Sequence, residues 1–123
     1  MKCLGQQFRF MRSDRDRVLV QHILDAISAV FAFVSGRTLP EFLEDDLVAS
    51  AVIKKFEIIG EASNRLSASF RSAHPNIPWQ DVIGMRNILI HDYMGVDLES
   101  VWDTIHRDLK SLQSQLQATI RPD

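Results

Sequence analysis

The sequence has a single cysteine, Cys3, close to its beginning. One cysteine excludes an intramolecular disulfide and disfavours a cysteine-based metal site. We find no apolar run that approaches the roughly 20 residues of a membrane-spanning helix, and no apolar core of a secretory signal peptide at the N-terminus. These absences predict a cytoplasmic protein with no membrane association.

The chain also lacks an excess of positive charge. Its 14 Lys and Arg residues are outnumbered by 16 Asp and Glu residues, which gives a formal net charge of -2. Any contact with a nucleic acid must therefore come from a local patch and not from the field of the whole molecule. The four histidines, His22, His74, His91 and His106, are scattered, so we expect neither a metal site nor another cofactor.

The remaining composition is that of an ordinary globular domain. The 123 residues include 46% hydrophobic and 24% charged residues, enough for one domain with a real core. No strand alternation, internal repeat or low-complexity tract is present. We expect an irregular N-terminal extension over residues 1–12, with Met11 as an alternative first residue, followed by a helical domain over residues 13–120.

Helical periodicity and capping residues divide this domain into segments. Apolar side chains recur at steps of three and four, Gly36 is typical of a helix end, and Thr38 with Glu41 forms a capping-box pattern. The pattern predicts an all-α fold, an antiparallel up-and-down bundle of four to five helices. Its expected segments are 14–35, 38–43, 45–70, 78–90 and a last helix from Asp97. Gly60, inside the third segment, would allow a neighbouring helix to approach closely.

The fourth segment carries an arginine where a core residue is expected. Val82, Arg86, Leu89 and Tyr93 follow one another at steps of four, three and four, so they lie on one helical stripe. A buried arginine needs a partner, because an unpaired charge is costly to desolvate. Either an acid of the third segment, Glu57 or Glu61, supports Arg86, or Arg86 lines a cleft that receives an anion.

His91 lies about 140° around an ideal helix from Arg86. The two side chains could converge only if the helix loosens near Ile90 or if a second subunit completes the site. Taken singly, Arg86 fits a structural ion pair, His91 a histidine at a helix C-terminus, and Tyr93 an amphipathic packing residue.

In combination, these residues resemble a known family. The resemblance lies in Ile58-Ile59-Gly60-Glu61-Ala62, Pro75-Asn76-Ile77-Pro78-Trp79, Gly84-Met85-Arg86-Asn87 with Leu89-Ile90-His91-Asp92-Tyr93, and in Val96-Asp97 with Val101-Trp102. In this order they are similar to the HepT family of the HEPN superfamily, small all-helical proteins encoded beside a minimal nucleotidyltransferase. The similarity covers about Val18 to Leu116.

This resemblance implies a function and roles for named residues. The family's site is an arginine, an adjacent polar residue, then histidine, any residue and tyrosine, which Arg86, Asn87, His91 and Tyr93 match. It implies the toxin of a toxin–antitoxin pair: a metal-independent endoribonuclease that cleaves cellular RNA, with tRNA as one candidate. It also implies silencing by AMP transfer to Tyr93 by the nucleotidyltransferase antitoxin, a homodimer, and a larger complex with that partner.

Two other interpretations of the same residues stay open. In one, the protein is a non-catalytic helical subunit that binds the nucleotidyltransferase or a nucleotide. In the other, it is a plain structural bundle whose Arg86 is paired with a glutamate. In the enzyme interpretation, the imidazole of His91 acts as general base or acid near its ordinary pKa, and Arg86 holds the phosphate.

Overall fold

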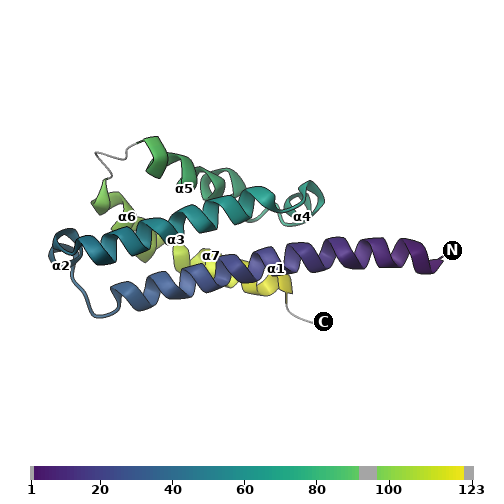
Figure 1. The fold of residues 1–123 in the computed structure, drawn as a ribbon, viewed down its shortest axis with the longest axis horizontal. Helices are drawn as coiled ribbons and strands as arrows, with labels where there is room; N and C mark the ends of the chain where they lie inside the picture. Colours follow the sequence, from purple (N-terminus) through teal and green to yellow (C-terminus); the bar gives the residue numbers. More distant parts are fainter. Residues whose placement is uncertain (1, 92–96, 121–123) are drawn as a thin grey trace.

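The computed structural model describes the backbone of residues 2–91 and 97–120, and the side chains of residues 14–86 and 97–120. Within these ranges the chain forms helices and no strand (Figure 1). The helices are α1 (Lys2–Val34), α2 (Leu39–Glu44), α3 (Asp46–Arg65), α4 (Ala68–Ala73), α5 (Trp79–His91), α6 (Leu98–Arg107) and α7 (Leu109–Ile120). The predicted all-α antiparallel bundle is confirmed, with α2 and α4 as short connecting helices.

Helix α3 occupies the middle of the arrangement. It makes its most extensive contacts with α1 on one side and α5 on the other, while α7 lies against α1 and α6 lies against α2. In Figure 1 the chain runs out along α1, returns along α3, and reverses again through α5. Helix α3 is therefore the element through which residues of α1 and α5 can contribute to one site.

The beginning of α1 differs from the expectation. Residues 2–12 were expected to be irregular, but α1 is one helix of 33 residues that starts at Lys2. This stretch contains no proline and is rich in good helix formers such as Lys, Gln, Arg and Met. Once the packed part of α1 has nucleated the helix, extension by further turns is inexpensive. The N-terminal part projects past the end of the bundle (Figure 1).

The turn between α1 and α3 follows its local sequence signals. Gly36 adopts a φ of 73°, the left-handed conformation that glycine tolerates. Thr38 and Glu41 form the reciprocal capping box that starts α2. Asp45 then caps α3 by accepting a hydrogen bond from the backbone N–H of Val48 at 3.1 Å. The predicted capping box of α2 is confirmed, and of the two candidates that the sequence offers as the cap of α3, Asp45 and Asp46, the cap is Asp45.

The third helix ends five residues before the expected boundary at Phe70. Helix α3 stops at Arg65, Leu66 is buried in an extended conformation, and Ser67 starts the separate helix α4. The cause is a tertiary contact: Asp16 of α1 accepts hydrogen bonds from the backbone N–H of Ser67 at 2.9 Å and from its hydroxyl at 2.7 Å. Hydrophobic periodicity through Phe70 does not reveal this contact. The last predicted helix is likewise divided, at Asp108, into α6 and α7.

The core consists of the apolar faces of these helices. The fully buried side chains include Val20, Ile23, Ile27 and Val30 of α1, Val52 and Ile59 of α3, and Ile105, Leu109 and Leu116 of the last two helices.

The stretch Asp14–Val34 is long and apolar enough to span a membrane, so the expectation that no such stretch exists is wrong. The reason is that Asp25 is the only formal charge between Val18 and Val34. In the structure this stretch is the core helix.

Candidate active site

The site begins with an unusually close contact between α3 and α5. A Cβ atom placed on Gly60 would lie 2.7 Å from the Cβ of Arg86 and 2.9 Å from its backbone nitrogen. Both separations are shorter than real Cβ contacts, so only glycine fits there. The expectation of close approach at Gly60 is confirmed. The contact brings the backbone of Arg86 against α3, next to Glu61.

Glu61 is the partner of Arg86. The Nη1 atom of Arg86 donates a short hydrogen bond to Oε2 of Glu61, and the two groups form an ion pair. The other carboxylate oxygen, Oε1, accepts a hydrogen bond from Nε of Arg65 at 3.1 Å. The side chain of Arg86 is 28% exposed and that of Glu61 39% exposed. The arginine is therefore satisfied inside the protein and still reaches solvent.

This pairing changes the acidity of the glutamate. The hydrogen bond from Arg86 is the largest effect and lowers the pKa of Glu61 below its ordinary value; burial opposes it in part, and the hydrogen bond from Arg65 lowers the pKa further. Glu61 is consequently a carboxylate throughout the neutral range. An anion that binds Arg86 must replace or share this carboxylate.

An open cleft lies beside the ion pair. It has a volume of about 450 Å³, within the range of small-molecule sites. Its polar wall consists of His22 from α1, Lys54, Glu57, Glu61 and Arg65 from α3, and Arg86 from α5. Leu19, Ile58 and Ala62 supply the apolar part of the lining. Arg86 thus pairs with an acid and also lines a cleft, so the two alternatives for Arg86 are compatible, and the binding of an anion in the cleft stays a prediction.

The other predicted residues are placed as follows. Glu57 lines the cleft, but its partner is Lys54 at 3.7 Å and not Arg86, so Glu57 as the support of Arg86 is wrong. It lies one turn before Glu61, and Glu61 already holds the guanidinium. Asn87 and His91 belong to the last turns of α5, and their side chains lie outside the described residues. Tyr93 lies outside the described residues altogether.

Three cleft residues were not singled out from the sequence: His22, Lys54 and Arg65. A signal existed for two of them, because Lys54, Glu57, Glu61 and Arg65 recur at steps of three and four, parallel to the apolar stripe of α3. His22 had no such signal, since its position depends on how α1 and α3 pair in space. Among residues 14–86 and 97–120, no group of three His, Cys, Asp or Glu side chains is arranged to hold a metal ion.

The fold and the cleft together define a class: a small helical bundle with a half-buried arginine in an open groove. Comparison with known proteins makes this specific. The family model described as "Ribonuclease HepT-like" matches residues 23–119, and the chain belongs to this HepT-like ribonuclease family. The resemblance that the motifs implied is thereby confirmed.

Individual relatives agree with this family. The chain is 38% identical over 106 residues to a probable ribonuclease HepT from Thermococcus cleftensis, covering 86% of this chain and 94% of the relative. It is 35% identical over 106 residues to a candidate RNase from Methanocaldococcus jannaschii, covering 85% and 97% of the two chains. A candidate RNase from Caldanaerobacter subterraneus subsp. tengcongensis is 33% identical over 107 residues, covering 87% and 96%. No solved structure matches the chain significantly.

Proposed function

We propose that this protein is a toxin endoribonuclease that cleaves cellular RNA in the cytoplasm without a metal ion, and that Arg86 binds the scissile phosphate. The observation that carries the proposal is the position of the Arg86 guanidinium in an open cleft, where its one hydrogen-bond partner among the described side chains is a carboxylate. A phosphate oxygen can replace that carboxylate, because guanidinium groups bind both in the same forked geometry. Membership of a ribonuclease family supports the same ligand.

The proposed reaction is an internal transesterification of RNA. The 2′-hydroxyl oxygen bonds to the adjacent phosphorus while the bond from phosphorus to the 5′-oxygen breaks. The products are a 2′,3′-cyclic phosphate and a free 5′-hydroxyl. His91 acts in proton transfer, Asn87 orients the substrate or the imidazole, and Arg86 stabilises the charge that develops on the phosphate oxygens.

The proposed assembly is a homodimer in which a second copy completes the site. Helix α5 is helical through His91, and helical positions 86 and 91 lie about 140° apart around its axis. A helix that is regular up to His91 favours the second of the two alternatives: a second copy, and not a loosened helix end, brings an arginine and a histidine together. We expect a single dimeric species in sedimentation velocity, and a monomer that cleaves RNA at full rate would contradict this assembly.

The proposed control is covalent. The phenolic oxygen of Tyr93 attacks the α-phosphorus of ATP on the nucleotidyltransferase antitoxin, pyrophosphate leaves, and the phenolic proton passes to solvent. The attached AMP adds negative charge close to Arg86, repels RNA and occludes the cleft. Mass spectrometry should detect AMP on the wild type after incubation with the partner and ATP. Modification of Tyr93→Phe would refute this acceptor.

RNA cleavage tests the central proposal. The wild type, produced without its partner, should cleave total cellular RNA to products with 2′,3′-cyclic phosphate ends in the presence of EDTA. His91→Ala should be at least about 100-fold slower, the usual contribution of a general acid or base, with an unchanged circular dichroism spectrum. His106→Ala is the matched control and should cleave normally, because His106 stacks on Trp102 of α6 at a ring separation of 4.2 Å.

The outcome separates the enzyme from the alternative function. If the wild type binds the nucleotidyltransferase but leaves RNA intact, the protein is the non-catalytic helical subunit instead. Cleavage that His91→Ala retains in full would keep the ribonuclease but remove His91 from its site.

A further inference from the structure

His22 occupies the wall of the cleft opposite Arg86. The bonds between Asp16 and Ser67 fix how α1 lies against α3. His22 follows Asp16 by six residues and Glu61 precedes Ser67 by six residues, so in antiparallel helices they lie at about the same level. Glu61 in turn holds Arg86. His22, Glu61 and Arg86 therefore form a row across α1, α3 and α5.

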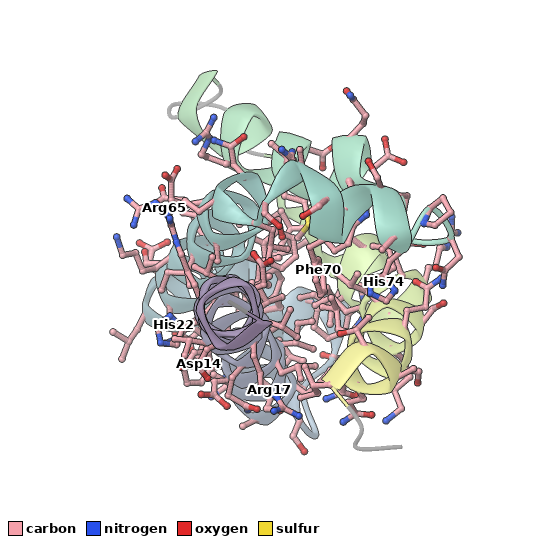
Figure 2. All side chains as sticks on the ribbon, turned by 90° about the vertical axis from the view of Figure 1, so that its right-hand side faces the viewer. Asp14, Arg17, His22, Arg65, Phe70 and His74 are labelled. Atoms are coloured by element: carbon pink, nitrogen blue, oxygen red, sulfur yellow. The ribbon has the colours of Figure 1, made fainter. Side chains whose placement is uncertain are left out.

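His22 is also the one histidine among residues 14–86 and 97–120 that lines this cleft. His74 packs on Phe70 with ring centroids 4.7 Å apart, and Nδ1 of His106 donates a hydrogen bond to the backbone carbonyl oxygen of Trp102 at 2.8 Å. Figure 2 shows His22 and Arg65 on one side of the bundle, with Phe70 and His74 on the opposite side. The imidazole of His22 is exposed and, among the described residues, has no hydrogen-bond partner.

The charged groups around His22 come from three helices. Helix α3 contributes the Lys54–Glu57 pair and the Arg65–Glu61 pair, and α5 contributes Arg86. On α1 itself, Asp25 lies one turn away and accepts a hydrogen bond from Gln21 at 2.9 Å, and Arg15 lies two turns away. Each of the two carboxylates in the cleft thus holds a cation, which leaves His22 to contact a ligand.

The proposed reaction requires two proton transfers: one from the 2′-hydroxyl and one to the 5′-oxygen that leaves. We propose, on the basis of the proposed function, that His22 is the general acid of this reaction. As the bond from phosphorus to the 5′-oxygen breaks, the imidazolium of His22 gives its proton to that oxygen, while His91 takes the proton of the 2′-hydroxyl. The two imidazoles thereby exchange protonation states, and Arg86 holds the phosphate.

A substrate with a sulfur leaving group tests this assignment. The RNA is a synthetic single strand that carries a cleavage site mapped on total cellular RNA, with either oxygen or sulfur at the bridging 5′ position. A thiolate leaves without being protonated, so it removes the need for an acid. His22→Gln should lose at least about 100-fold in kcat/KM on the oxygen substrate. It should be within a few-fold of wild type on the sulfur substrate.

A matched control completes the test. His106→Gln should match wild type on both substrates, and circular dichroism should show that each variant is folded. Full activity of His22→Gln on the oxygen substrate, or a loss that sulfur does not rescue, would overturn the assignment. A wild type that cleaves neither substrate would instead refute the proposed function.

Discussion

The side chain of Arg86 combines two properties: it is paired with an acid inside the protein, and it is still exposed in the cleft. Arg86 occupies a stripe of apolar positions, so it requires a partner, and Glu61 provides one. The pair is still open enough to contact a ligand, because a quarter to two-fifths of each side chain is exposed. The sequence predicted that Arg86 needs an acidic partner, and it left Glu57 and Glu61 as equal candidates for that partner. Only the packing of α5 on Gly60 decides between them, because it places Arg86 beside Glu61.

Gly60 of α3 and Gly84 of α5 provide a matched test of this packing. Gly60→Ala would place a methyl group against the Cβ and backbone of Arg86, so we expect it to destabilise the protein by about 1–3 kcal/mol through overpacking. Gly84→Ala meets no atom within 4 Å and should stabilise α5 by up to about 1 kcal/mol. Urea unfolding measures both. Equal stabilisation by the two substitutions would show that the helices are not in close contact at Gly60.

The lowered pKa of Glu61 predicts a pH dependence with a definite sign. A carboxyl group whose pKa is depressed by folding stabilises the folded state above its unfolded pKa, near 4.3 for glutamate, and loses this contribution as pH falls through the folded value. The stability difference between wild type and Glu61→Gln should therefore be largest at neutral pH and shrink below about pH 4. Unfolding at several pH values measures it.

Comparison of wild type with Glu61→Gln separates the contribution of Glu61 to the pH dependence of stability from the contributions of other carboxyl groups. Glu41 and Asp97, whose pKa values are also lowered by hydrogen bonds from Thr38 and Ser100, are present in both proteins, so their contributions cancel. A difference that stays constant from pH 7 to pH 3 would mean that the pair with Arg86 does not form in solution.

At the scale of helices, local signals and tertiary contacts had different predictive value. Caps and turns such as Thr38, Gly36 and Asp45 act within a few residues, so the sequence located them correctly. The end of α3 depends instead on Asp16, which is 51 positions away from Ser67. The apolar spacing of Leu66 and Phe70 fits a continuing helix equally well, and no local rule contradicts it. His22 escaped prediction for the same reason, since its role depends on the pairing of α1 with α3.

The contact between Asp16 and Ser67 can be tested by truncation. Asp16 is 6% exposed, and Asp16→Ala would leave the N–H and hydroxyl of Ser67 without their acceptor. We expect a loss of about 1–3 kcal/mol of stability, the range for a buried group deprived of its partner. Asp14 lies half a helical turn before Asp16 and is exposed, so Asp14→Ala should change stability by less than about 0.5 kcal/mol. Similar effects of the two substitutions in urea unfolding would show that the contact is not significant.

At the scale of the whole molecule, the net charge of -2 limits how RNA is attracted. The cations of the cleft are Lys54, Arg65 and Arg86, so we expect about three phosphate contacts per site. At roughly 0.7 counterions released per contact with a single strand, the logarithm of the association constant should fall with log salt at a slope of about -2. Fluorescence anisotropy of His91→Ala with labelled RNA measures it. A slope steeper than about -5 would indicate a much larger basic surface.

The apolar length of α1 has a consequence for the biosynthesis of the protein. Residues 14–34 are synthesised before α3, their main packing partner. At about 5–20 residues per second, the roughly 30 residues up to the end of α3 take some 2–6 s to synthesise. During that interval the apolar face of residues 14–34 lacks the helix that buries most of it in the folded protein. Prompt translation through α3 thus becomes a condition for correct folding.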